Sequence, residues 1–391
     1  MPDDRNSDSN PSAAPLIPFL RPRLVRLEKY RRYVEGIDER RLYSNFGPLN
    51  AQFEKRVLHE HFAGRGAAST VNNATTGLML ALAQAKRPGG RYAVMPSFTF
   101  AATPLAAMWA GLEPLFVDVR GDDFCLSEAS LDEALRRHGE EVAAVVPYAA
   151  FGQPMDLAPY ERLMQRGIPV VVDAAASFGA TRGGAAFAAG FPGVVVFSFH
   201  ATKAFGIGEG GLVYSADAAL IARLREAANF GFGPDRACLR QGLNAKLPEI
   251  AAAIGLATLD EFADVKRRRI EIHRWYEEEL VRCGMPQQGW RMQLEAGEVA
   301  HQFFPLLAPP SASNVALVRA LTDRGIEIRT YFHPACHAQP AFERCARLAL
   351  PETEALARRI LSLPLWEEMG REHVASVVAG LAREQNRLGG A

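Results

Sequence analysis

The sequence predicts an α/β fold, in which a mainly parallel β-sheet is covered by helices and a smaller C-terminal α+β domain follows. Short apolar runs rich in valine alternate with helical runs from about residue 67 to residue 230. A long helical stretch, from about Pro248 to Cys283, then leads out of this region. Alternating strands and helices are typical of a parallel sheet, because each parallel crossover needs a connecting element.

The strands of the sheet are expected where apolar and β-branched residues run together. The candidates are Tyr92–Met95, Leu115–Val119, Ala143–Pro147, Val170–Asp173, Val194–Phe199 and Leu212–Tyr214, with helical runs such as Leu131–Arg137 and Asp217–Ala228 between several of them. In the C-terminal part, Phe303–Leu307 and Ile326–Tyr331 lie between helices and indicate the α+β domain. The triplet Arg267-Arg268-Arg269 on the long helix is interpreted as a solvated face.

This pattern divides the chain into three segments. Residues 1–17 are expected to be a disordered tail, because the first sixteen residues are polar and lack the apolar core of a signal peptide. Residues 18–255 are expected to form the large, cofactor-binding domain with an N-terminal segment. Residues 256–391 are expected to form the small C-terminal domain.

The composition is typical of a soluble enzyme. The chain has 391 residues, enough for two domains with cores of their own, and its 44 Lys and Arg equal its 44 Asp and Glu. No charge excess therefore favours nucleic acid or an anionic membrane as a partner, and no apolar run approaches the ~20 residues of a membrane span. Five scattered cysteines without a close pair indicate reduced thiols and a cytoplasmic location.

Lys203 is the first candidate catalytic residue. It follows the apolar run Val194–Phe199, and glycines at positions 206, 208, 210 and 211 come after it. An amine at the end of a buried strand loses water, and desolvation lowers the pKa of a lysine because it disfavours the charged form. The neutral amine can attack an aldehyde and form a Schiff base. A surface lysine after an ordinary edge strand is the alternative.

Asp173 is the expected partner of Lys203. A run of three valines, 170–172, leads to this one carboxylate, and small residues follow it. A carboxylate at the end of a parallel strand points into the crevice where α/β proteins bind ligands. Pyridoxal phosphate needs an anion there, because the anion keeps the pyridine nitrogen protonated and makes the ring an electron sink. The alternative is an aspartate that caps the next helix.

Two further segments offer contacts for such a cofactor. In the segment 71–82, small and polar residues that include Thr75 and Thr76 precede an apolar helical run, and a helix N-terminus suits a phosphate group. A plain N-capped helix is the alternative for this segment. Phe100, which follows a strand end, can stack on a flat heteroaromatic ring, although a single Phe is more often a core residue.

Together these segments resemble the DegT/DnrJ/EryC1/StrS family of pyridoxal-phosphate sugar aminotransferases. The resemblance runs from about Pro18 to about Leu381 and implies fold type I, with a mainly parallel sheet of seven strands. It also rests on shorter motifs, which are Ser44 to Pro48 with Phe53-Glu54, Gly111 to Val119, Gly152-Gln153-Pro154 with Asp156, Gly242-Leu243-Asn244, Gly325-Ile326 with Arg329, Tyr331, Pro334 and His337, and Leu361 to Leu365.

The resemblance implies roles for individual residues. Lys203 matches the Schiff-base lysine and Asp173 the partner of the pyridinium. Asn244 matches an asparagine that reaches the phosphate of the neighbouring subunit, which implies a homodimer with shared active sites. The other matches to the cofactor site are Ala74, Thr75 and Ser198 at the phosphate and Phe100 on the ring. Further candidates for substrate contacts are His200, Arg329 and His337.

Two positions depart from the family pattern. The family commonly has Gln or His three residues after the aspartate, near the phenolic oxygen of the cofactor, where this chain has Ala176. Many relatives also carry a histidine in the segment Pro147-Tyr148-Ala149, where this chain has none. Both changes concern substrate choice and reaction outcome. A branch of the family that removes a hydroxyl has His in place of the lysine, and Lys203 argues against that branch.

No metal site is predicted. His333, Cys336 and His337 lack a fourth ligand and a paired motif, and His59 with His61 lacks the zincin spacing.

The predicted function is a pyridoxal-phosphate-dependent aminotransferase that moves an amino group from glutamate or glutamine to a keto sugar, expected to be nucleotide-linked. One alternative is an aminotransferase for a cyclitol or another small ketone. The other is a protein that binds the cofactor and acts as a regulator or scaffold with little turnover, since a fold does not fix a function.

Overall fold

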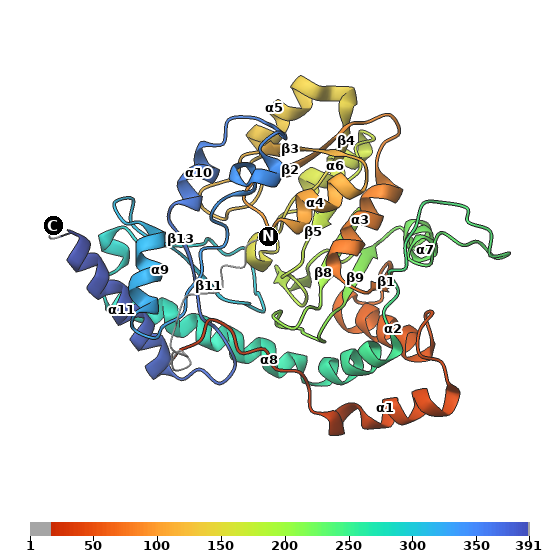
Figure 1. Cartoon of the computed structure of the whole chain (residues 1–391), viewed down its shortest axis with the longest axis horizontal. Helices are drawn as coiled ribbons and strands as arrows, with labels where there is room; N and C mark the ends of the chain where they lie inside the picture. The colour runs from red at the N-terminus through yellow and green to blue at the C-terminus, as the bar shows by residue number, and fades with distance from the viewer. Residues whose placement is uncertain (1–16, 390–391) are drawn as a thin grey trace, which may run out of the picture.

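One continuous β-sheet organises the N-terminal two-thirds of the computed structural model, which describes residues 17–389 (Figure 1). Its strand order is β1-β9-β8-β5-β4-β2-β3-β12. The strands are β1 (Ala67–Val71), β2 (Tyr92–Pro96), β3 (Glu113–Val117), β4 (Val142–Val145), β5 (Val171–Asp173), β8 (Val194–Ser198), β9 (Gly211–Ser215) and β12 (Ala346–Arg347). Two parallel bridges, Val145 to Val170 and Tyr148 to Asp173, join β4 to β5.

The mainly parallel sheet of seven strands is confirmed, with the two-residue β12 as an added edge strand. β9 runs antiparallel to both of its neighbours, and the other pairs are parallel. Each predicted strand of this sheet lies within two residues of its predicted bounds. β1 was not among the predicted strands, because its sequence Ala-Ala-Ser-Thr-Val holds few bulky apolar residues.

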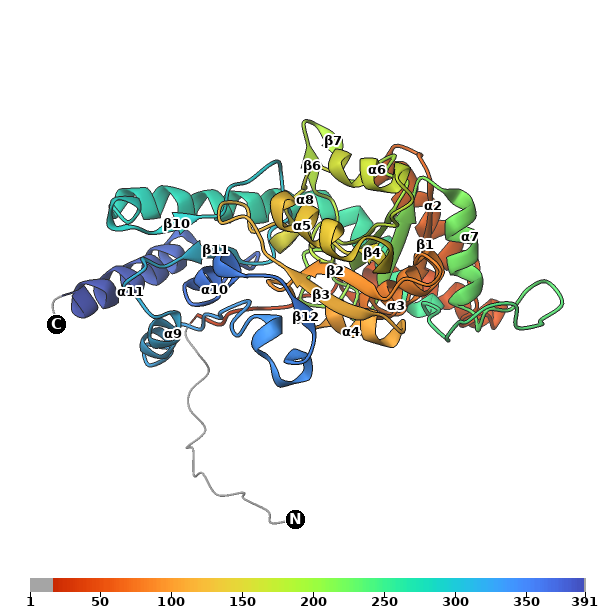
Figure 2. The ribbon, with the colours of Figure 1, turned by 90° about the horizontal axis from the view of Figure 1, so that it is seen from above.

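Helices cover both faces of the sheet, as Figure 2 shows from above. On β8, Val194 and Val196 belong to the core cluster of one face, while Val195 and Phe197 belong to the cluster of the other, as the two-residue period of a strand requires. The first face carries α3 (Ala74–Ala85), α4 (Ala102–Trp109) and α7 (Ala218–Ala227), and the second carries α2 (Pro48–Phe62), α5 (Glu128–His138), α6 (Ala158–Gln165) and the first half of α8 (Glu249–Arg282).

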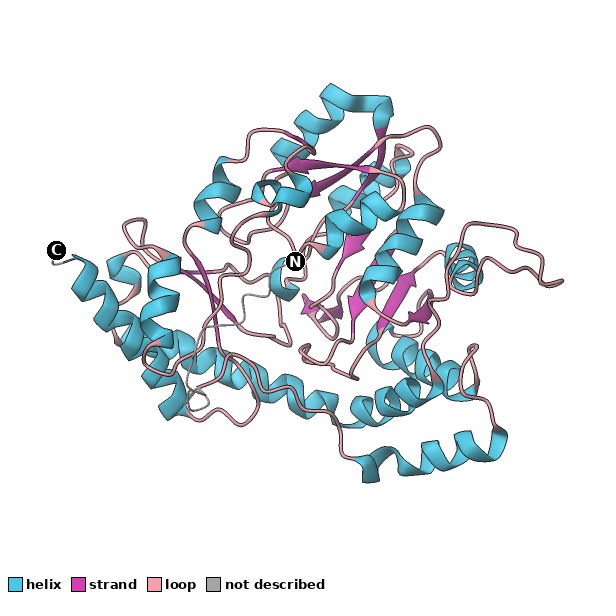
Figure 3. Cartoon of the chain, in the orientation of Figure 1, coloured by secondary structure: helices cyan, strands magenta, loops and turns pink. Residues whose placement is uncertain are grey.

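The C-terminal part has a small antiparallel sheet and a core of its own (Figure 3). The sheet has the order β10-β11-β13, formed by β10 (Arg291–Met292), β11 (Phe304–Leu307) and β13 (Ile360–Leu363). The helices are the second half of α8, α9 (Asn314–Thr322) and α11 (Arg371–Gly389), while α10 (Pro351–Ala357) precedes β13 and α1 (Leu27–Arg40) packs on α8.

The predicted domain boundary at residue 255 falls inside α8. Phe262 on this helix packs in the core of the large sheet, whereas Ile272 and Tyr276 pack in the core of the C-terminal part. One continuous helix therefore serves both cores, and we propose that the two parts meet along α8 rather than at a linker.

The structure corrects two expectations and leaves a third, the tail at residues 1–16, untested. Ile326–Tyr331 is not a regular strand, because it pairs only through single bridges, from Ile326 to Ile17 and from Arg329 to Ser362. The predicted tail 1–17 lies outside the described residues except for Ile17, which is ordered by that bridge and by a hydrogen bond from its N–H to the carbonyl of Gly325. Arg269 is 5% exposed, so the arginine triplet is not a fully solvated face.

No helix among the described residues is long and apolar enough to cross a membrane. Each of the five cysteines is free.

Candidate active site

A cavity of about 600 Å³ lies at the carboxyl ends of the parallel strands. It forms where polar residues end β5 and β8 and where the loops after β2 and β4 turn away from the sheet. Seven of the predicted site residues line it, namely Ala74, Thr75, Phe100, Asp173, Ser198, His200 and Lys203. Residues far apart in the sequence thus meet at the edge where α/β sheets bind ligands.

Lys203 reaches this cavity from the loop between β8 and β9. Its backbone N–H donates to the carbonyl of His200 at 2.9 Å, which closes a turn directly after the strand. The side chain is half-buried, and Nζ donates to Oε1 of Gln302 at 2.9 Å. Burial lowers the pKa of Lys203 to about 8, although the nearby Asp173 carboxylate acts in the opposite direction. A neutral amine is therefore accessible near neutral pH.

Asp173 ends β5 and is 3% exposed. Its Oδ2 accepts a hydrogen bond from the Thr103 hydroxyl at 2.6 Å, and its Oδ1 accepts from the N–H of Ala175 at 3.1 Å. Burial raises its pKa, while the two hydrogen bonds and Lys203 act against that rise. The next elements after Asp173 in the described chain are strands, and the next α-helix, α7, begins only at Ala218, so the alternative of a helix cap is wrong. Among the described residues no cationic group lies within ion-pair distance of this buried carboxylate, and Lys203 acts on it only from further away.

The first turn of α3 forms the polar end of the cavity. The first amides of a helix have no partners within it. In α3 the Asn73 side chain accepts a hydrogen bond from one of them, the N–H of Thr76, at 2.9 Å. The amides of Ala74 and Thr75 likewise have no partner within the helix, and both residues line the cavity. At Gly211 an added Cβ would come within 3.0 Å of the Ala74 nitrogen, so this glycine lets β9 approach the helix start closely.

Aromatic side chains form the remaining walls. Phe100 lines the cavity but is 59% exposed, so it is not a core residue. Its ring lies 6.3 Å from that of Phe332, and Tyr331 and Tyr148 also line the cavity. A flat apolar ligand therefore finds aromatic faces in addition to the polar end.

Three predicted site residues lie outside the cavity of their own chain. Asn244 is exposed, and its Oδ1 accepts a hydrogen bond from Lys246 at 2.5 Å. Arg329 pairs with Glu327, and its guanidinium lies 5.6 Å from the centre of the Phe19 ring. His337 lies 2.7 Å, through Nδ1, from the hydroxyl of Ser97, and burial lowers its pKa. These positions do not support substrate contacts by Arg329 or His337 within one chain.

The structure adds residues that the sequence did not indicate. Gln302, which contacts Lys203, lies 99 positions later in the chain, just before β11. Thr103, which contacts Asp173, lies on α4. Ala176 lines the cavity without a side-chain donor, whereas Ala149 is fully buried and the cavity is lined by Tyr148 instead.

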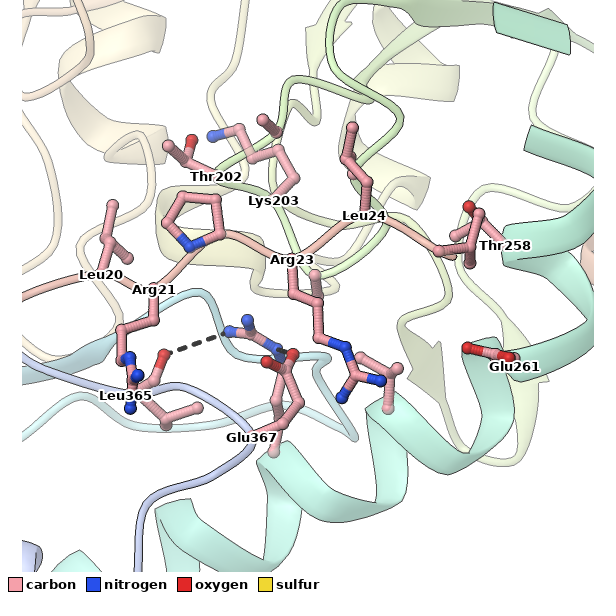
Figure 4. A pocket seen from close by; sticks show the side chains of 17 residues that line it. Leu20, Arg21, Arg23, Leu24, Thr202, Lys203, Thr258, Glu261, Leu365 and Glu367 are labelled. Carbon is pink, nitrogen blue, oxygen red and sulfur yellow. Dashed lines mark hydrogen bonds and ion pairs between the residues drawn. The ribbon is translucent and has the colours of Figure 1, made fainter. Parts of the chain in front are cut away.

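A smaller cavity of about 100 Å³ lies behind Lys203 (Figure 4). The segment from Leu20 to Leu24 passes through it, with Lys203 on one side and Glu367 on the other, and the amine of Lys203 points away from it. The back of the site is therefore closed by the N-terminal segment.

One cluster with metal-ligating groups lies elsewhere among the described residues. His273, Glu295 and His301 bring their ligand atoms within 4.8 Å of one another. The two imidazole rings are stacked, with centres 3.7 Å apart and planes only 15° from parallel. An imidazole nitrogen binds a metal through a lone pair in the plane of its ring. Two nearly parallel rings therefore cannot both direct a nitrogen at one zinc ion at the ~2.0–2.1 Å of a zinc–nitrogen bond. Contacts of 3.2 Å and 3.5 Å from Glu295 to the two rings favour a hydrogen-bonded cluster instead.

Comparison with known families gives a match over most of the chain. The profile of the DegT/DnrJ/EryC1/StrS aminotransferase family matches residues 26–382. Protein Rv3402c of Mycobacterium tuberculosis is 32% identical over 387 residues, covering 96% of this chain and 92% of that protein. UDP-N-acetyl-3-dehydro-alpha-D-glucosamine 3-aminotransferase of Acidithiobacillus ferrooxidans is 32% identical over 334 residues, covering 84% of this chain and 88% of that enzyme.

Solved structures show the same similarity. A crystal structure from Bacillus cereus, assigned as a PLP-dependent aminotransferase, superposes with a TM-score of 0.92 at 45% identity and covers 93% of this chain and 99% of its own. DesI, solved in the presence of its TDP-sugar product, superposes with a TM-score of 0.84 at 33% identity, covering 95% of this chain and 93% of its own.

Proposed function

Because the chain belongs to the DegT/DnrJ/EryC1/StrS aminotransferase family, we propose that it moves an amino group from glutamate or glutamine to a nucleotide-linked keto sugar. The observation that carries the proposal is the meeting of Lys203, Asp173 and the start of α3 in one cavity. The sugar is supported by relatives, since the enzyme of Acidithiobacillus ferrooxidans is named for a UDP-linked substrate and DesI was solved with a TDP-sugar. A cytoplasmic location is part of the proposal.

The residues of the cavity fit pyridoxal phosphate. The free amides of Ala74 and Thr75 and the hydroxyl of Ser198 would hold its phosphate, Asp173 would face its ring nitrogen, and Phe100 would lie against its ring. When bound, the cofactor supplies an electron sink that stabilises a carbanion at the substrate. The deep burial of Asp173 without a full cationic partner is what a cationic ring nitrogen would relieve.

The side chains of this chain then have distinct tasks. Lys203 holds and moves a proton at Nζ, for which a pKa near 8 is well suited, because a general acid and base works best with a pKa close to the operating pH. Thr103 fixes the orientation of the Asp173 carboxylate by donating to Oδ2. The rings of Phe332, Tyr331 and Tyr148 line the cavity and would limit the access of water to the reacting atoms.

The proposed substrates can be tested in two half-reactions. We expect glutamate or glutamine to change the absorbance of the bound cofactor and to release the matching 2-oxo acid. The aminated enzyme should then turn over a nucleotide-linked keto sugar at least about tenfold faster than the free keto sugar, because contacts to the remote nucleotide raise the rate at the reacting carbon. Preference for a cyclitol ketone would contradict the sugar assignment. If neither donor releases a 2-oxo acid, the result would contradict amino transfer itself.

We propose further that two chains form a homodimer with shared sites. Asn244 is exposed, lies outside its own chain's cavity and belongs to the connection between α7 and α8. A loop of this connection extends from the body of the molecule in Figures 1 and 2. Large apolar side chains are exposed on this loop and on α4, among them Phe230, Leu239, Met108 and Trp109, the last of which is 70% exposed. Large apolar side chains left in solvent are candidates for a protein interface, and we propose that a second copy covers them while bringing Asn244 to the partner's phosphate site.

Mixing two inactive variants tests this arrangement. A dimer of one Lys203→Ala chain and one Asn244→Ala chain has one site with both defects and one site with neither. Random exchange at equal amounts should therefore restore about a quarter of the wild-type activity, since half of the dimers are mixed and each has one intact site. The measurement requires that Asn244→Ala alone is impaired and that exchange is verified, for example with a mass-tagged chain. If exchange is verified and the activity does not exceed that of the two parent variants, Asn244 acts within its own chain and the shared-site proposal is wrong.

A further inference from the structure

The amide of Gln302 joins Lys203 to a chain of hydrogen bonds along the cavity wall. Lys203 Nζ donates to Gln302 Oε1 at 2.9 Å, and Gln302 Nε2 donates to Thr202 Oγ1 at 3.3 Å. Thr202 Oγ1 lies 2.8 Å from Nδ1 of His200. Lys203, Thr202, Gln302 and His200 all line the cavity, so the chain of bonds borders the reacting groups.

The end groups fix the direction of these bonds. An ammonium has donors only, so the atom of Gln302 that faces Lys203 is its carbonyl oxygen and the amide NH2 faces Thr202. The backbone N–H of Thr202 also points at Nδ1 of His200, at 3.3 Å, so this nitrogen is an acceptor. The Thr202 hydroxyl therefore donates to His200 and accepts from Gln302. Each member of the chain is satisfied by the next.

The backbone at Gln302 is held by a buried arginine. Arg269 on α8 donates to the carbonyl of His301 at 2.7 Å and to that of Gln302 at 3.4 Å, and it also donates to Leu365 at 3.3 Å. Its charge is balanced by Glu367 at 2.7 Å, which lies with Leu365 below Lys203 in Figure 4. The position of the backbone at Gln302 is thus set by groups outside the cavity, while the side-chain amide is held by Thr202.

We propose that Gln302 is a positioning residue for Lys203. Gln302 holds the amine in the cavity by accepting a hydrogen bond from it, and Thr202 in turn holds the amide of Gln302. The inference rests on the proposed aminotransferase function, because it assigns Gln302 a task in the proton transfers of Lys203. An amine that gives one N–H to Gln302 keeps its other hydrogens and its lone pair directed elsewhere in the cavity. The bond to Gln302 is the only one that the described residues give to Nζ.

The same contact is expected to favour the charged form of the amine. Burial lowers the pKa of Lys203 to about 8, and the Asp173 carboxylate acts in the opposite direction. A hydrogen-bond acceptor such as the Gln302 carbonyl oxygen favours the protonated form of an amine, so its loss is expected to lower the pKa. The other titratable or charged groups that line the two cavities beside Lys203 come from several elements. In the large cavity they are Asp173 at the end of β5, Tyr148 after β4, His200 and Glu209 between β8 and β9, and Tyr331 after α9. In the small cavity they are Arg21 and Arg23 in the N-terminal segment, Glu261 and Arg269 on α8, and Glu367 after β13. These groups are unchanged in a Gln302 variant, so a change in titration reports on the amide alone.

The test measures how fast the cofactor-free protein captures pyridoxal phosphate at Lys203 as a function of pH, from the absorbance of the bound cofactor. Gln302→Leu should shift the midpoint of this profile to lower pH by about one unit, since the lost acceptor favoured the charged amine. Gln302→Glu should shift it upward. Gln84→Leu is the matched control: Gln84 on α3 donates to the carbonyl of Gln241, outside the cavity, and its variant should keep the wild-type midpoint.

Thr202→Val gives an independent arm, because it keeps the shape of Thr202 and removes the hydroxyl that orients the amide. It should shift the midpoint to lower pH, as Gln302→Leu does, but by a smaller amount. If Gln302→Leu does not fold, the midpoints of Thr202→Val and Gln302→Glu test the inference in its place. Equal midpoints in the wild-type protein and the folded Gln302 variants would overturn the inference. A wild-type protein that captures no cofactor at Lys203 would instead overturn the proposed function, so the two failures are distinguishable.

Discussion

Replacing Lys203 by alanine is expected to lower turnover by at least about 10³-fold, because the variant loses both the attachment point of the cofactor and the group that moves the proton. The fold should be retained, since Lys203 contributes one side-chain hydrogen bond to the structure, the bond to Gln302. The phosphate end of the cavity is unchanged in the variant, so cofactor binding without covalent attachment should persist. Steady-state rates and equilibrium dialysis measure the two effects separately.

Two companions sharpen this experiment. Lys203→Arg keeps a positive charge but cannot give up its proton at accessible pH, so it should be as inactive as the alanine variant. Lys29→Ala removes an exposed lysine on α1 that pairs with Glu261 at 3.3 Å and should leave activity unchanged. Borohydride treatment of the wild-type protein should fix the cofactor to the peptide that contains Lys203, as mass spectrometry would show. Labelling of another lysine would refute the assignment.

The chemistry of the cavity was predictable wherever it follows from local sequence. Asp173 comes directly after a run of valines, and Lys203 comes four positions after the end of the apolar run Val194–Phe199. Strand ends of a parallel sheet converge at one edge. The helix start at Ala74 has a similar local signature. Gln302 has none: it stands between His301 and Phe303 in a segment without a motif, and only the packing of β11 against the large sheet's loops brings it to Lys203. Contacts made by tertiary packing leave no local pattern.

The arginine triplet shows the same limit for the fold. A run of charges on a helix usually lies in solvent, which is the case for Arg267 but not for Arg269, two positions later. Arg269 is buried because it lies on the side of α8 that faces the junction of the two cores. There three backbone carbonyls and Glu367 bind its guanidinium. Residue type predicts exposure only until a second element supplies partners for a charged group.

Asp173→Asn is expected to slow the half-reaction with the amino donor by about 10²- to 10³-fold, because the variant removes the negative charge that faces the ring nitrogen while keeping the shape of the side chain. Stopped-flow absorbance of the bound cofactor measures this rate. Thr103→Val is the matched comparison: it removes the hydroxyl that donates to Oδ2 at 2.6 Å but leaves the carboxylate in place. Its effect should be smaller, about tenfold, as for one hydrogen bond to a charged group.

Although Asp173→Asn is expected to slow the reaction, it should not lower the stability of the cofactor-free protein. Burial raises the pKa of Asp173 in the folded state above its value in the unfolded chain. The folded protein therefore binds the proton more tightly, and as pH rises above the unfolded value the ionised carboxylate lowers the free energy of unfolding. Asparagine removes this cost, so Asp173→Asn should unfold at the same or a higher temperature at neutral pH. A clear loss of thermal stability together with an unchanged half-reaction would mean that Asp173 is structural, since a carboxylate kept for catalysis is expected to cost stability until the cofactor binds.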